Sequence, residues 1–102
     1  MKLAHYPAEQ LKKDILAVIG KYLDLNKYRV FFFGSRVNGK GDDRADIDVG
    51  IEGTREVPGV AMVEIREALE NLPTLYKIDV VDFKKVGEEF REVALTHTEA
   101  VN

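Results

Sequence analysis

The sequence predicts an α/β (α+β) fold, a small mixed β-sheet with helices packed on one of its faces. Two observations support this prediction. Segments with apolar residues at helical spacing alternate along the chain with short runs of β-branched and aromatic residues, which are typical of strands. The length of 102 residues suits one domain, residues 1–102, with a single hydrophobic core and little left for a second lobe.

Periodicity places the expected elements in the order helix, strand, strand, helix, strand, helix. Helices are expected over residues 8–23, from Pro58 to a stop at Pro73, and from residue 83 onward; strands are expected over residues 28–33, 46–51 and 77–81. Residues 34–44 are polar and contain glycines, so they are expected to form a loop, or a short helix and a loop. Asp82 is expected to cap the last helix, and the tail after that helix to be frayed.

Composition excludes several classes of function. The chain has no cysteine, which excludes disulfides, thiolate zinc sites and thiol nucleophiles. A formal net charge of −3 argues against direct binding of DNA or RNA, whereas an NTP brings its own magnesium to an acidic pocket. No apolar run is long enough to span a bilayer, and the first six residues do not resemble a secretory signal. We therefore expect a cytoplasmic protein without membrane contact.

Acidic side chains gather on one face of the predicted sheet. Asp46 and Asp48 are two residues apart on a strand and share a face, while the β-branched residues beside them face the helices. The same alternation puts Asp79, on the next strand, with them. A solvated strand face is the simpler interpretation, but aspartate is a poor strand former. Carboxylates placed so closely favour a site for Mg²⁺, with room for two ions about 3.5–4 Å apart.

Gly34 and Ser35 follow the first predicted strand directly, where a sharp turn exposes backbone N–H groups. These amides and the Ser35 hydroxyl are suited to the outer phosphates of an NTP, although a plain turn is the better explanation of an isolated Gly-Ser pair. A P-loop is excluded because Gly41 stands where that motif needs Ser or Thr. The acidic stretch fails the EF-hand pattern, and a hairpin turn at Asn38-Gly39 would put Gly34 inside a strand.

The histidines receive no role. His5 and His97 lie near opposite ends of the sequence, and both are expected on the surface, away from the acids.

Taken together, these motifs resemble a known family. The order Gly34-Ser35, ten residues, Asp46-Ile47-Asp48 and then Asp79 is similar to the active-site pattern of the DNA polymerase β-like nucleotidyltransferases. Arg36 and Gly39 fit the Gly-Ser-Arg-x-x-Gly form of the first motif. At this length the chain resembles the minimal nucleotidyltransferases (MNT) that serve as antitoxins to HEPN-domain ribonuclease toxins.

The resemblance implies the polymerase β-like nucleotidyltransferase fold and a role for each motif. It implies that Gly34 and Ser35 bind the triphosphate of the nucleotide. Arg36 is expected to contact a phosphate, and a solvated position on the surface is the equal alternative. It implies that Mg²⁺ and the catalytic chemistry belong to Asp46, Asp48 and Asp79, with Asp79 helping to deprotonate the acceptor hydroxyl.

The implied activity is Mg²⁺-dependent transfer of AMP from ATP to a hydroxyl of a HEPN-domain toxin, a tyrosine hydroxyl in this family, within a hetero-oligomer. The alternative is a non-catalytic nucleotide-binding module that neutralises its partner by masking it. Transfer to a small molecule is a third possibility, but such relatives carry extra domains for the acceptor.

Overall fold

The structure is a computed structural model that describes residues 1–37 and 46–102. In this part of the chain, a four-stranded sheet has the order β3-β2-β1-β4. Its strands are β1 (Tyr28–Phe33), β2 (Ile47–Gly53), β3 (Ile78–Asp82) and β4 (Glu99–Ala100). Strand β1 runs antiparallel to β2 and β4, and β3 runs parallel to β2, so the sheet is mixed as predicted.

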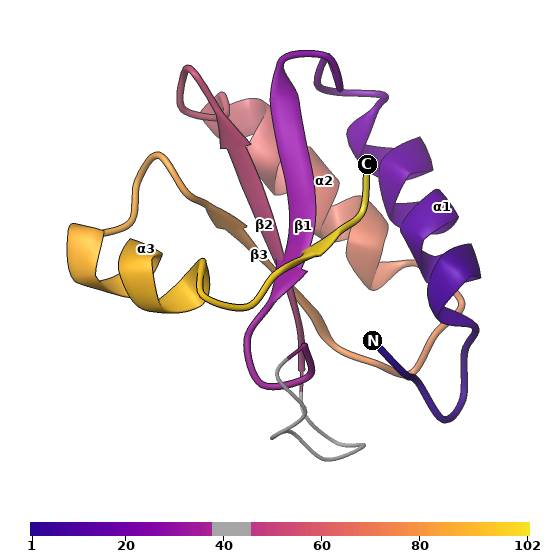
Figure 1. The fold of residues 1–102 in the computed structure, drawn as a ribbon. Coiled ribbons are helices and arrows are strands. Elements are labelled where there is room, and N and C mark those ends of the chain that lie inside the picture. Colours follow the sequence, from indigo (N-terminus) through magenta and orange to yellow (C-terminus); the bar gives the residue numbers. More distant parts are fainter. Residues whose placement is uncertain (38–45) are drawn as a thin grey trace.

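Two helices cover one face of this sheet, α1 (Ala8–Ile19) and α2 (Gly59–Glu70) (Figure 1). The apolar side chains of β2, Ile47, Val49 and Ile51, are completely buried in the core that they share with both helices. The alternation predicted for β2 is therefore confirmed. Among the described residues, no helix is long and apolar enough to cross a membrane.

The first helix is shorter than predicted. It ends at Ile19 with Gly20 as its C-cap, and the chain continues in tight turns in which Lys21 N–H bonds to the Val18 carbonyl and Tyr22 N–H to that of Ile19. Glycine has low helix propensity, so the helix ends there although the apolar spacing continues. Leu23 is still buried, which explains why the periodic pattern extended to it.

The other face of the sheet carries an aromatic cluster, which we define as Phe31, Phe33 and Phe83. The Phe83 ring lies edge-on to Phe31 and Phe33, with centroids 4.9 and 5.0 Å apart. Helix α3 (Glu88–Ala94) lies on this side, opposite α1 and α2, and brings Phe90 to 6.0 Å from Phe33 (Figure 1). The predicted start of this helix at residue 83 is wrong, because Phe83 is held in the aromatic cluster.

Asp82 does not cap the last helix, which corrects the sequence prediction. Strand β3 extends to Asp82, so this side chain points with those of Ile78 and Val80 and is buried. Its Oδ2 accepts a hydrogen bond from Val57 N–H at 2.8 Å, and its Oδ1 accepts one from Lys84 N–H at 2.9 Å. Asp82 thus joins the segment before α2 to the turn after β3, and the N-cap of α3 is Gly87.

The predicted fraying of the tail is wrong. Strand β4 pairs with Phe31 and Phe32 of β1, and Val101 is buried. Val101 N–H donates to the Val30 carbonyl at 2.9 Å, and Val30 N–H donates to Asn102 Oδ1 at 2.8 Å. The end of the sequence therefore forms one edge of the sheet.

Candidate active site

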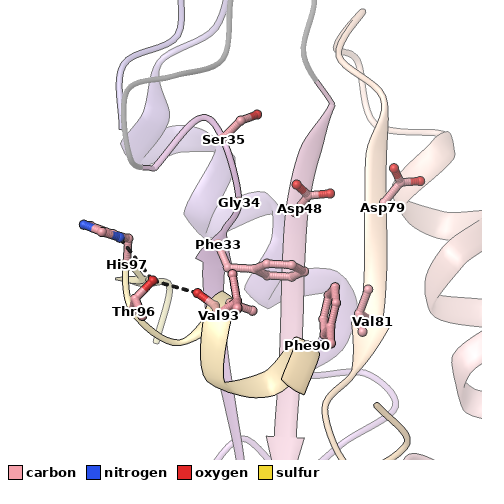
Figure 2. A pocket seen from close by; sticks show the side chains of 11 residues that line it. Phe33, Gly34, Ser35, Asp48, Asp79, Val81, Phe90, Val93, Thr96 and His97 are labelled. Atoms are coloured by element: carbon pink, nitrogen blue, oxygen red, sulfur yellow. Dashed lines mark hydrogen bonds between the residues drawn. The ribbon is translucent and has the colours of Figure 1, made fainter. Parts of the chain in front are cut away.

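Asp48 and Asp79 are directly paired across the two parallel strands β2 and β3. Paired residues of neighbouring strands point to the same face. Figure 2 shows both carboxylates on the same side of the sheet, and this side faces away from the core shared with α1 and α2. The predicted convergence of acids from two strands is thus present for this pair.

Burial and neighbouring negative charge both act on the carboxyl of Asp48. Burial of Asp48, followed by the negative charges of Asp79 and Asp46, raises the pKa of the Asp48 carboxyl above its ordinary value. The exposed Lys77 places its Nζ 3.8 Å from both Asp46 Oδ2 and Asp79 Oδ1. One ammonium group thus lies near two of the three carboxylates.

Gly34 brings the backbone against this acidic group. Its φ angle is +86°, and a Cβ atom at this position would lie 2.2 Å from Asp48 Oδ2. Residue 34 must therefore lack a side chain, both for its conformation and for the space taken by the carboxylate. Val37 N–H bonds to the Gly34 carbonyl at 3.1 Å, which closes a turn that contains Ser35. The sharp turn predicted after the first strand is confirmed.

A cleft of about 660 Å³ connects the turn and the acids. Its polar end contains Gly34, Ser35, Asp48 and Asp79 (Figure 2). The rest of its lining comes from β1, β3, α3 and the segment after α3, and consists of Phe33, Val81, Phe90, Val93, Ala94, Thr96 and His97. Such a cleft can accept a charged phosphate chain at one end and a flat apolar group, such as a nucleobase, at the other.

The remaining predicted site residues lie outside the lining of this cleft. Asp46 immediately precedes β2 and contacts Lys77. The guanidinium of Arg36 lies over the ring of Tyr76, 4.7 Å from its centroid. Gly39, the last residue of the first motif, and the alternative turn at Asn38-Gly39 lie outside the described residues.

Sequence reasoning missed the apolar wall of the cleft and misplaced one histidine. His5 and His97 are exposed as expected, but His97 lines the same cleft as Asp48 and Asp79, so its predicted separation from the acids is wrong. The return of the chain to pair β4 with β1 brings this segment back. Phe90 and Val93 fitted the helical spacing expected after residue 83. In the structure both are large apolar residues of α3 that remain substantially exposed.

Within the described residues, no group of three His, Cys, Asp or Glu side chains is gathered closely enough to hold a metal ion. The donor chemistry is nevertheless that of a hard divalent cation, because only carboxylate oxygens converge. Burial and the negative charges of Asp79 and Asp46 raise the pKa of the Asp48 carboxyl, and a bound cation would favour its charged form. Asp48 and Asp79 therefore supply the kind of donor that Mg²⁺ prefers, and the described residues gather no third such donor beside them.

Comparison with known proteins shows similarity over most of the chain, beyond the motifs described above. A family model described as polymerase beta, nucleotidyltransferase matches residues 12–101. A relative from Haemophilus influenzae, named "Probable protein adenylyltransferase MntA", is 29% identical over 85 residues, which cover 81% of this chain and 75% of the relative.

Solved structures share the fold. A structure of the tri-AMPylated Shewanella oneidensis HEPN toxin in complex with MNT antitoxin matches with a TM-score of 0.68 and 17% identity, over 92% of this chain and 71% of that chain. A toxin-antitoxin structure with AMP-PNP matches with a TM-score of 0.67 and 18% identity, over 89% and 72% of the two chains. A MntA-HepT complex gives 0.67 and 15%, over 92% and 71%. At these identities the likeness concerns the fold, and it agrees with the predicted fold class.

Proposed function

Because the chain belongs to the polymerase beta nucleotidyltransferase family, we propose that it transfers AMP from ATP to a tyrosine hydroxyl of a HEPN-domain toxin and so acts as its antitoxin. The observation that carries this proposal is the register of β2 and β3, which pairs Asp48 with Asp79 at the end of the cleft where Gly34 and Ser35 turn. Carboxylates and a tight backbone turn at one point are what transfer of a nucleotidyl group needs.

The turn is proposed as the site of the outer phosphates. Backbone amides of a tight turn, together with the Ser35 hydroxyl, donate hydrogen bonds to phosphate oxygens without adding a positive charge that would pair with the acids. Gly34 contributes by leaving space, because its missing Cβ lets the phosphate-binding backbone lie against Asp48. Arg36, whose guanidinium lies over the Tyr76 ring, is proposed to make a further contact with a phosphate.

The proposed metal ligands are Asp46, Asp48 and Asp79, which would hold two Mg²⁺ ions. When bound, the ions supply charge stabilisation at the α-phosphate and lower the pKa of the acceptor hydroxyl. Asp79 acts on the acceptor side, since it lies on the strand farther from Gly34. Its carboxylate orients the hydroxyl and accepts its proton. Most of the rate enhancement comes from holding the reacting groups in line.

The relatives support the nature of the donor and the acceptor. One structure that shares this fold contains AMP-PNP, and another contains a HEPN toxin that carries AMP groups beside its MNT antitoxin. The Haemophilus relative carries the name of a protein adenylyltransferase. The apolar half of the cleft, with Phe33 and Phe90, suits an adenine ring.

The experiment is incubation of the chain with labelled ATP, Mg²⁺ and the product of the adjacent gene, which the proposal expects to be a HEPN-domain protein. We expect label on a tyrosine of the partner and loss of the partner's ribonuclease activity. Absence of label from the partner would contradict transfer. If alanine variants of the three aspartates neutralise the partner as well as the unaltered chain does, the protein acts by masking instead.

A further inference from the structure

The direction from which the acceptor arrives follows from the order of the strands and rests on the proposed function. In an in-line displacement, the attacking oxygen and the leaving oxygen lie on opposite sides of the phosphorus. The leaving pyrophosphate is at Gly34 and Ser35, beyond the end of β1, and β2 lies between β1 and β3. The attacking hydroxyl must therefore come from the side of β3, past Asp79.

A second cavity lies on that side. It is a groove of about 580 Å³ between the C-terminal half of α2 and strand β3, and Asp79 lines both this groove and the cleft. The groove is lined by Arg66, Leu69 and Glu70 of α2 and by residues 74–80. Asp79 thus stands where the two cavities meet, with the turn at Gly34 on one side and the groove on the other.

The groove follows an open edge of the sheet. In the described part of the chain, β3 has a strand neighbour on one side, β2. The Lys77 carbonyl and the Phe83 N–H bond to β2, so alternate residues of β3 direct their backbone groups the other way. The Arg66 guanidinium bonds to the Val80 carbonyl at 3.3 Å, as expected for a carbonyl that faces the groove. An open edge of this kind is a template for an extended peptide.

The surface of the groove indicates the class of molecule that fits it. Leu75 at its rim is fully exposed to solvent. The charged residues of the lining balance, with Arg66 and Lys77 against Glu70 and Asp79. A balanced surface does not suit the phosphate backbone of a nucleic acid, whereas an exposed leucine beside a strand edge suits a polypeptide.

We infer that the groove between α2 and β3 is the docking site of the acceptor protein. An extended segment of the acceptor lies along the edge of β3, packs an apolar side chain on Leu75 and places the hydroxyl that is to be modified beside Asp79. The hydroxyl oxygen forms the new bond to the α-phosphorus, the bond to pyrophosphate breaks, and the proton of the hydroxyl passes to the Asp79 carboxylate.

The test uses Leu75→Glu, with Val60→Glu as the matched control. The side chains of Leu75 and Val60 are both exposed to solvent, that of Val60 at 74%, but only Leu75 is among the residues that line the groove. The KM for the HEPN-domain protein and the KM for ATP are measured separately with purified full-length chains. Leu75→Glu is expected to raise the KM for the protein acceptor at least tenfold and to leave the KM for ATP unchanged, while Val60→Glu changes neither and Leu75→Met restores the acceptor KM.

The outcomes separate this inference from the proposed function. If the unaltered chain modifies the HEPN-domain protein and Leu75→Glu does so with an unchanged acceptor KM, the groove is not the docking site, although the transfer reaction stands. An equal rise in both KM values would also overturn the inference, because it would indicate general damage. If the unaltered chain binds ATP but modifies no protein, the proposed function fails, and the docking site fails with it.

Discussion

Gly34 is the residue where backbone conformation and site chemistry meet most closely. Its positive φ of +86° sharply turns the chain at the end of β1, and the absence of a Cβ lets the turn approach the Asp48 carboxylate. The sequence could place Gly34 and Ser35 after a strand, because that needs only local pattern. It could not give the contact with Asp48, which depends on the pairing of β1 with β2.

Gly34→Ala is therefore expected to impair both folding and transfer. The substitution forces an alanine into the left-handed region and drives its Cβ into Asp48 Oδ2, at a cost of about 1–3 kcal/mol in the free energy of unfolding. Denaturant unfolding and an adenylyl transfer assay measure the two effects. Gly59→Ala at the start of α2 is the control, because nothing lies within 4 Å of its added Cβ, and it should leave both unchanged or slightly raise stability.

Asp48 illustrates a site that lowers the stability of its own fold. Because its pKa is raised in the folded protein, the folded state binds a proton there more tightly than the unfolded state does. The charge of Asp48 thus lowers stability above its folded pKa, and this loss disappears as the pH falls toward and below its ordinary value.

We accordingly predict that Asp48→Asn, without divalent ions, increases stability at pH 7 by about 0.5–1 kcal/mol, the range for partly exposed charges. The gain should shrink as the pH is lowered, and added Mg²⁺ should stabilise the unaltered chain but not the variant. Thermal unfolding in chelator and in Mg²⁺, at several pH values, measures this. A variant less stable than the unaltered chain in chelator would contradict the view that the buried charge of Asp48 destabilises the fold.

At the scale of the elements, the sequence predicted what depends on local periodicity. The two helices of the core and the three longer strands are present, and β2 turns its apolar residues to the helices as expected. The errors lie where tertiary contacts override local pattern. Phe83 fitted the periodicity of a helix but packs on Phe31, and β4 is a strand of two residues whose pairing spans most of the chain. No window of sequence contains that information.

Asp82 is another residue whose role depends on tertiary contacts that the local sequence does not reveal, and it supports a prediction of its own. Its two oxygens are the partners of Val57 N–H and Lys84 N–H in a buried position. Asp82→Ala leaves both donors without that acceptor and should cost about 2–4 kcal/mol in the free energy of unfolding. Asp82→Asn should fall between the two, and Glu92→Gln on the exposed surface of α3 should change little. Equal stability of Asp82→Ala and the unaltered chain in urea would contradict a stabilising role for these two hydrogen bonds.

At the scale of the whole molecule, ion pairs connect segments that are far apart in sequence. Glu99 on β4 accepts hydrogen bonds from the Met1 ammonium and from Lys12 of α1, the latter at 3.0 Å. Burial alone would raise the pKa of Glu99, but these two cations outweigh it and lower the pKa. The site is similarly a product of the whole fold, since its cleft takes residues from β1, β2, β3, α3 and the segment before β4.

The lowered pKa of Glu99 gives a stability prediction with a definite sign. An acid with a depressed pKa in the folded state stabilises the fold above its unfolded pKa, and this contribution disappears as the pH falls through the folded value. Glu99→Gln should thus lower stability at pH 7 by about 0.5–1 kcal/mol and flatten the loss of stability below pH 4.5. Urea unfolding from pH 3 to 7 measures this, and Glu64→Gln at an exposed position of α2 is the control. An unchanged acid slope would contradict it.

The family resemblance of the motifs is confirmed by the match over most of the chain, so the most direct test concerns the residues that are proposed to carry the chemistry. That test is the intact mass of the HEPN-domain partner after incubation with ATP, Mg²⁺ and either the unaltered chain or Asp48→Asn. We predict addition of AMP by the unaltered chain and a rate at least about 100-fold lower with Asp48→Asn, which circular dichroism should show to be folded. Undiminished addition of AMP by folded Asp48→Asn would contradict the account.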